Sequence, residues 1–87
     1  MAKRKRVVRL FFNTFYEDAA KAILERLERS YGRVRVVRSQ VLPEFYYVEI
    51  QVGENEDPAR VRTEVENLVA QVGGDRVFGV KAYDVQT

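Results

Sequence analysis

Residues 45–52, Phe-Tyr-Tyr-Val-Glu-Ile-Gln-Val, constrain the fold more than any other stretch of this chain. Their aromatic and β-branched side chains favour a β-strand, in which successive side chains point to opposite faces. One face then carries an almost wholly apolar set that suits a core, namely Tyr46, Val48, Ile50 and Val52. The opposite face carries Phe45, Tyr47, Glu49 and Gln51. That second face is either a half-covered surface or a place where flat groups can stack.

A first amphipathic helix is expected from Thr14 to about Tyr31. Thr14 followed by Glu17 is a capping-box pattern, in which each side chain satisfies a backbone N–H at the start of a helix. Gly32 tolerates the left-handed conformation that often follows the last turn. Apolar residues recur at steps of three and four, and the stripe expected to be buried is Ala20, Ile23, Leu24, Leu27 and Tyr31.

A second helix is expected between Asp57 and the pair Gly73-Gly74. Asp57 is a favourable N-cap, and Pro58 at the first helical position is a strong start signal. The glycine pair marks the end of the helix. Its expected buried stripe is Val61, Val65, Leu68, Val69 and Val72.

Three further strands are expected at residues 5–12, 33–40 and 75–85. In the second of these, the doubled Val36-Val37 breaks the alternation and predicts either a bulge or a fully covered patch. Pro43 follows in a turn, because proline cannot sit inside a paired central strand. In the last strand, one face is expected to carry Phe78, Val80 and Ala82, and the other Val77, Lys81 and Tyr83.

The expected order is strand, helix, strand, strand, helix, strand in one domain spanning residues 1–87, with a frayed basic end at residues 1–4. Two helices can bury their stripes only against a sheet, and both crossovers must be right-handed. We therefore predict an α+β, ferredoxin-like βαββαβ sandwich, in which both helices pack on one face of a four-stranded antiparallel sheet. The first and third strands lie side by side in its centre, which places Phe11 beside Phe45 and Tyr47.

The two central strands resemble those of the RNA recognition motif family, which carries one aromatic in a short first-strand motif and two in an eight-residue third-strand motif. Leu10-Phe11-Phe12-Asn13-Thr14-Phe15 is similar to the first motif, with Phe11 in the stacking position. Pro43-Glu44-Phe45-Tyr46-Tyr47-Val48-Glu49-Ile50 is similar to the second, with Phe45 and Tyr47 in the stacking positions. The resemblance covers most of the chain in element order, and it implies binding of single-stranded RNA.

Composition narrows the chemistry that the chain can perform. The sequence contains no His and no Cys, so the commonest general base, a thiol nucleophile, a disulfide and a thiolate zinc site are all excluded. We therefore expect no enzymatic activity, no metal site, no cofactor and no small-molecule substrate. No run of about 18 apolar residues is present, so we expect no membrane partner and a cytoplasmic protein. The net charge of +2 permits a nucleic-acid partner without requiring one.

The candidate site is the sheet face that the helices leave uncovered. Its stacking residues are Phe11, Phe45 and Tyr47. Around them we expect cations that meet phosphates, together with one further aromatic residue; these are Arg9, Arg33, Arg35, Lys81 and Tyr83.

Two alternatives remain open at the level of the sequence. A patch of this kind is rarely left bare on a monomer, so a second copy of the chain could cover it, and the chain would then be a self-associating regulatory or assembly domain that forms a homodimer. The interface would then consist of Phe11, Phe45, Tyr47, Val77 and Tyr83. The other alternative is an engineered protein with no assigned activity. The absence of Trp, His and Cys, with Met only at residue 1, is typical of engineered chains and also of some thermophilic proteins.

Overall fold

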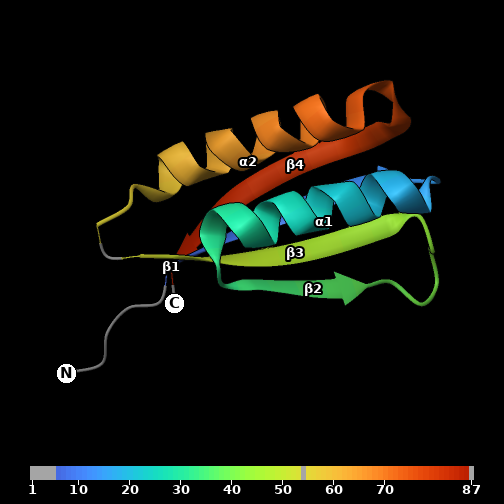
Figure 1. Cartoon of the computed structure of the whole chain (residues 1–87). Coiled ribbons are helices and arrows are strands. Elements are labelled where there is room, and N and C mark those ends of the chain that lie inside the picture. The colour runs from blue at the N-terminus through green and yellow to red at the C-terminus, as the bar shows by residue number, and fades with distance from the viewer. Residues whose placement is uncertain (1–5, 54, 87) are drawn as a thin grey trace.

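Residues 6–53 and 55–86 are described by a computed structural model, and this part of the chain forms four strands and two helices (Figure 1). The elements are, in order, β1 (Arg6–Thr14), α1 (Glu17–Tyr31), β2 (Val34–Arg38), β3 (Phe45–Val52), α2 (Pro58–Gly73) and β4 (Val77–Gln86). A short 3₁₀ turn, Gly74–Arg76, joins α2 to β4. The predicted frayed end at residues 1–4 lies outside the described residues.

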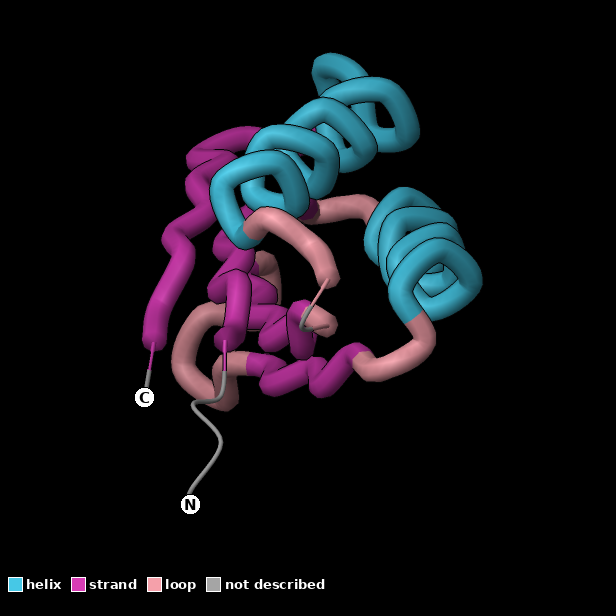
Figure 2. The backbone as a smooth tube through the Cα atoms, turned by 90° about the vertical axis from the view of Figure 1, so that its left-hand side faces the viewer, coloured by secondary structure: helices cyan, strands magenta, loops and turns pink. Residues whose placement is uncertain are grey.

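Within that described part, the strands form one antiparallel sheet in the order β2-β3-β1-β4. Both helices lie against the same face of this sheet, as the view along its edge makes clear (Figure 2). Strands β1 and β3 are the central pair, with Phe11 opposite Tyr47 and Asn13 opposite Phe45. The predicted ferredoxin-like α+β fold is confirmed.

The core is a single layer of side chains between the sheet and the two helices. Strands β1 and β3 supply it through alternate residues, and each helix supplies its apolar stripe. The largest fully buried side chains are Phe12, Leu10, Ile23, Leu27, Ile50, Val8, Val48, Val61, Val65 and Val69. The alternation read from residues 45–52 is confirmed, because Tyr46, Val48 and Ile50 are buried.

The start of α1 differs from the prediction. The helix begins at Glu17 with Tyr16 at the N-cap position, and Tyr16 makes no side-chain capping bond. Thr14 is instead the last residue of β1, almost fully buried. Its hydroxyl donates a hydrogen bond to the Arg76 carbonyl at 2.8 Å and accepts one from the Tyr16 N–H at 3.2 Å. The predicted capping box is therefore wrong, because the Thr14 hydroxyl ties β1 to the segment that precedes β4.

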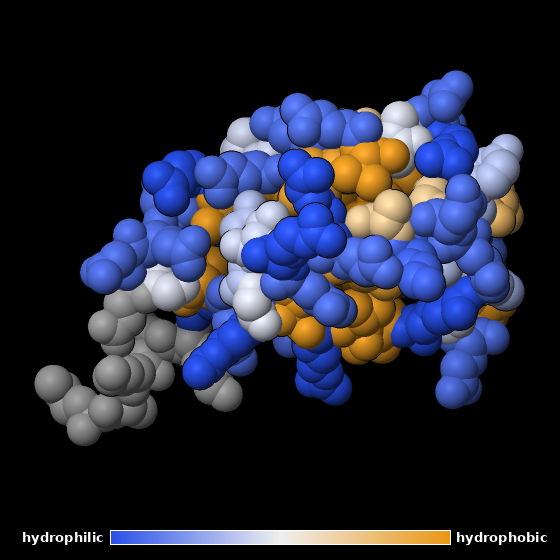
Figure 3. All heavy atoms as spheres, in the orientation of Figure 1, coloured by the Kyte–Doolittle hydropathy of each residue, from blue (hydrophilic) through white to orange (hydrophobic). Residues whose placement is uncertain are grey.

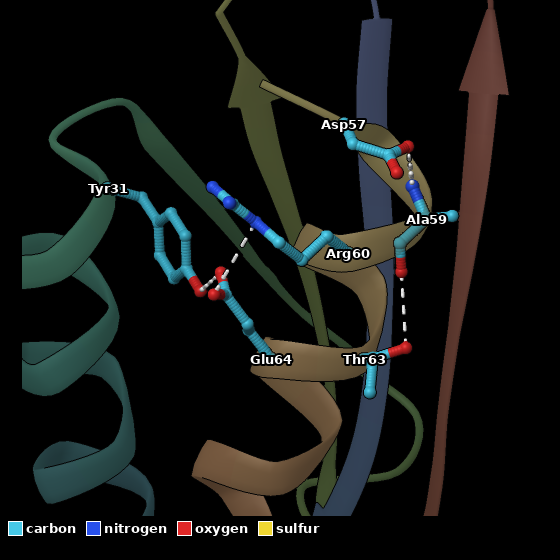
Figure 4. A network of polar contacts seen from close by, with 6 residues as sticks. All are labelled: Tyr31, Asp57, Ala59, Arg60, Thr63 and Glu64. Carbon is cyan, nitrogen blue, oxygen red and sulfur yellow. Dashed lines mark hydrogen bonds and ion pairs between the residues drawn. The ribbon is translucent and has the colours of Figure 1, made fainter. Parts of the chain in front are cut away.

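The start of α2 agrees with the prediction. The Asp57 carboxylate accepts a hydrogen bond from the Ala59 N–H at 3.1 Å, and Pro58 is the first helical residue (Figure 4). Nearly two turns later, Glu64 reaches across to α1, where the Tyr31 hydroxyl donates to Glu64 Oε1 at 3.3 Å (Figure 4). This contact joins the end of α1 to the first turns of α2.

Strand β2 contains no bulge. Its pairing with β3 is continuous from Val34 opposite Ile50 to Arg38 opposite Tyr46. Val36 and Val37 are 37% and 39% exposed, so neither is fully covered. Both explanations offered for the doubled valines are therefore wrong. Strand β2 is an edge strand, where each face is only partly covered.

Strand β4 is shifted in its pairing with β1 between Phe11 and Asn13. Gly79 lies in this irregularity with a φ of +61°, a conformation that favours glycine. Before the irregularity, Phe78 pairs with Asn13 and is 48% exposed, whereas Val77 packs against the core. The predicted faces of these two residues are therefore exchanged, and Val77 is not part of the uncovered face.

Candidate functional site

The sheet face turned away from α1 and α2 is called the open face below. Strand pairing assigns its members, because residues opposite one another in register point to the same side of a sheet. The central positions on β1 and β3 are Arg9, Phe11, Asn13, Phe45, Tyr47 and Glu49. The flanking positions are Arg33, Arg35 and Val37 beside β3, and Phe78, Lys81 and Tyr83 beside β1. All eight residues singled out from the sequence lie on this face.

Four aromatic rings on the open face form a cluster around Phe11. The Phe11 ring centroid lies 5.0 Å from that of Tyr47 and 5.8 Å from that of Phe45, with planes inclined by only 22° and 25°. Tyr83 meets Phe11 edge-on, with its ring centroid at 6.0 Å. Phe11, Phe45 and Tyr47 are half-buried, and Tyr83 is 49% exposed. Part of the surface of these four rings is therefore in contact with solvent, and we call Phe11, Phe45, Tyr47 and Tyr83 the aromatic cluster.

Cationic side chains surround the aromatic cluster. Arg9 is opposite both Glu49 and Tyr83, Lys81 is opposite Phe11, and all of these cations are exposed. Near the β2 edge, Arg33 Nη1 donates a hydrogen bond to Gln51 Oε1 at 3.3 Å. A shallow hollow of about 420 Å³ lies at this edge of the sheet, and its lining is largely polar: Val7, Arg33, Val34, Arg35, Glu49 and Gln51. The open face thus presents guanidinium and ammonium groups on both sides of the aromatic rings.

One carboxylate lies among these cations. The described strands place a single acidic residue on the open face, Glu49, which is half-buried and lies opposite Arg9 on one side and Arg35 on the other. The Tyr47 hydroxyl donates a hydrogen bond to Glu49 Oε1 at 2.7 Å. Partial burial raises the pKa of Tyr47, and the hydrogen bond to Glu49 and the negative charge of Glu49 raise it further. The positive charges of Arg9 and Arg35 have the opposite, smaller effect on this pKa. Tyr47 therefore stays a neutral hydrogen-bond donor at neutral pH.

Sequence reasoning missed two aromatic residues next to this face. The Phe78 and Phe15 rings lie 5.5 Å apart, and Phe15 is 73% exposed. The Asn13 side chain donates a hydrogen bond to the Phe78 carbonyl at 3.3 Å. The signal that could have placed Phe78 was Gly79, because an isolated glycine inside a strand often marks a bulge that reverses the alternation.

The other side of the molecule offers a different kind of surface. Hydrophilic residues cover much of it, with apolar residues showing through in patches (Figure 3). A groove of about 460 Å³ runs between α1 and β2, and Leu24, Val36 and Tyr46 contribute its apolar part. No group of three or more Asp or Glu side chains suited to a metal ion is found within residues 6–53 and 55–86. In the same residues, neither helix has the length and apolar character needed to cross a membrane.

Comparison with known proteins adds no family assignment. A scan of the chain against protein-family models and a search against curated proteins each return no match.

Proposed function

We propose that this chain is a non-enzymatic module that binds single-stranded RNA on its open face. The observation that carries the proposal is the aromatic cluster around Phe11, with its ring centroids 5.0 to 6.0 Å apart, on a face bordered by cations. The resemblance of β1 and β3 to the strands of the RNA recognition motif supports the same partner. A cytoplasmic location goes with this proposal and rests on the sequence alone.

Stacking supplies the part of the affinity that does not depend on charge. Every nucleobase has a flat π-face, so an exposed aromatic surface accepts bases with little sequence preference. Replacing such a platform residue by alanine costs roughly 1–3 kcal/mol per base. Three rings of the aromatic cluster, those of Phe11, Phe45 and Tyr47, lie on the two central strands, which have a neighbouring strand on both sides. A rigid platform loses little conformational entropy when a base stacks on it.

Electrostatic attraction supplies the other part. Lys81 lies beside Phe11 on β4, Arg9 lies two residues before Phe11 on β1, and Arg33 and Arg35 lie at the β2 edge. A strand crossing the cluster would therefore meet cations before and after the stacked bases. Phosphate neutralisation by such groups releases counterions and makes binding weaken as salt is added.

The same cations favour RNA over a second copy of the chain as the occupant of the open face. Pairing two open faces would bring the cations of one copy toward those of the other and remove them from water, which is costly without opposite charges. RNA supplies a negative charge at every nucleotide, whereas the described strands of a second copy bring only Glu49 to this face.

A matched pair of tyrosine variants tests the proposal. Fluorescence anisotropy of a labelled eight-nucleotide RNA should give a saturable titration with the unaltered protein. Tyr47→Ala should weaken binding by roughly ten-fold or more, because it removes one ring of the aromatic cluster. Tyr16→Ala is the control, since Tyr16 is a tyrosine outside the aromatic cluster, at the N-cap of α1. Equal losses for the two variants, or no titration with the unaltered protein, would contradict the proposal.

A further inference from the structure

The negative charge of the Glu49 carboxylate is unfavourable on a face proposed to bind phosphates. It is the only acidic group that the described strands put on the open face, and it lies in register between Arg9 and Arg35. It is also half-buried, so its negative charge acts at the centre of the surface and not at its rim. A negative charge at this position weakens the attraction of the open face for RNA phosphates. A hydrogen-bond donor on the ligand would give the Glu49 carboxylate a role there.

The Glu49 carboxylate is held in a defined position. The 2.7 Å hydrogen bond from the Tyr47 hydroxyl fixes its Oε1 atom. A carboxylate offers about four lone-pair sites, so one such bond leaves it with capacity to accept from another donor. The same bond places the carboxylate at the hydroxyl end of the Tyr47 ring. The ring and the acceptor therefore form one unit on β3.

We infer that Glu49 accepts a hydrogen bond from the exocyclic amino group of the base stacked at Tyr47, so that the open face prefers cytosine to uracil. The inference rests on the proposed function and adds a base preference to it. Cytosine carries an amino group at position 4 that donates to carboxylates, whereas uracil carries a carbonyl oxygen there. That oxygen faces the carboxylate as a second acceptor and gains no bond from it. Adenine and guanine also carry an exocyclic amino group, so the same contact is open to them.

Charge balance among the cations is the competing explanation for Glu49. If the carboxylate only offsets Arg9 and Arg35, removing its charge strengthens binding to every RNA alike, because the phosphates then meet a more positive surface. If the Glu49 carboxylate accepts a hydrogen bond from an amino group of the base, removing its charge weakens binding to cytosine and strengthens binding to uracil. The two explanations thus predict opposite signs for the cytosine oligonucleotide.

Cytosine and uracil octamers separate the two explanations. Anisotropy titrations of labelled C8 and U8 RNA with the unaltered protein should show about ten-fold tighter binding to C8, as expected for one hydrogen bond to a charged group. Glu49→Gln should bring the C8-to-U8 ratio close to one, by weakening C8 and strengthening U8. Glu25→Gln removes the same charge from an exposed position on α1 and should leave the ratio unaltered.

A second variant guards against a general effect of altering Glu49. Tyr47→Phe keeps the ring but removes the hydroxyl that holds the carboxylate, so it should lower the C8-to-U8 ratio while U8 binding persists. Equal binding of C8 and U8 by the unaltered protein, or stronger binding of both by Glu49→Gln, would overturn the inference and leave the proposed function standing. Binding of neither oligonucleotide by the unaltered protein would overturn both.

Discussion

The Phe11 and Tyr47 rings lie 5.0 Å apart, centroid to centroid, across the central pair of strands, and their planes are inclined by 22°. The two residues are directly opposite one another in the β1–β3 register. Aromatic pairs in such offset arrangements contribute about 0.5–1.5 kcal/mol beyond the area they bury. The pair thus stabilises the central strands and also forms the middle of the surface to which we assign RNA binding.

Salt dependence is the first prediction. The four cations Arg9, Arg33, Arg35 and Lys81 are exposed on the open face. If each neutralises one phosphate, affinity for a single strand should fall roughly fifty-fold between 50 and 200 mM salt, given a slope of about −0.7 per contact. Arg35→Gln should reduce that slope by about 0.7. Anisotropy titrations at four salt concentrations give both slopes, and a slope near zero would exclude phosphate contacts by these groups.

A second prediction separates the two faces of the sheet by stability. Phe12→Ala should lower the free energy of unfolding by about 3–5 kcal/mol, because Phe12 is fully buried in the core. Tyr47→Ala should cost only about 1–2 kcal/mol, since Tyr47 is half-buried and loses its ring contact with Phe11 and its hydrogen bond to Glu49. Urea titrations followed by circular dichroism measure both values. Equal costs would mean that the open face belongs to the core.

Gly79 supplies the third prediction. Its φ is +61°, and a Cβ atom added there would lie 2.7 Å from Asn13 Nδ2. Gly79→Ala should therefore destabilise the protein by roughly 1–2 kcal/mol from the backbone conformation, with a further cost from displacing the Asn13 side chain. The midpoint of thermal unfolding reports the change. A raised midpoint, as is common where alanine replaces glycine at negative φ, would show that the irregularity in β4 is absent.

The fourth prediction concerns stability at high pH. Burial, followed by the charge and hydrogen bond of Glu64, raises the pKa of Tyr31 to about 12. The pKa in the unfolded chain is about 10, so the neutral phenol favours the folded state below pH 10. That contribution should disappear as pH rises from 10 through 12.

Tyr31→Phe isolates this contribution from those of other titrating groups. The stability difference between the unaltered protein and Tyr31→Phe should be constant below pH 9 and should shrink as pH rises above 10. Urea midpoints at successive pH values give this difference. A difference that grows with pH would contradict the assigned contact between Tyr31 and Glu64.

The fold could be predicted from the sequence because each element carries its own local signal. The alternation in residues 45–52, the start of α2 at Asp57 and Pro58, and the glycines after each helix are all read within one element. The order of elements then leaves few compact arrangements, and the observed strand order is one of them.

The errors at Thr14 and at Phe78 have different causes. Thr14 has a capping pattern with Glu17, but its hydroxyl bonds to Arg76, which is 62 residues away in the chain. Simple alternation along β4 places Phe78 on the core face, but the irregularity at Gly79 puts it on the open face. The positions of Arg9, Phe11 and Tyr47 on one face could be predicted, because they follow from strand pairing. The hydrogen bond between Tyr47 and Glu49 could not, since it depends on side-chain conformation.

Molar mass measured by light scattering after size exclusion, with and without an unstructured single-stranded RNA, tests the central claim most directly. We expect the mass of a monomer, about 10.1 kDa, that increases by the mass of one RNA when RNA is present, and a smaller increase at higher salt. A mass near twice that of the monomer, unaltered by RNA, would contradict the account and identify the open face as an interface between two copies. A monomer whose mass does not respond to RNA would also contradict it.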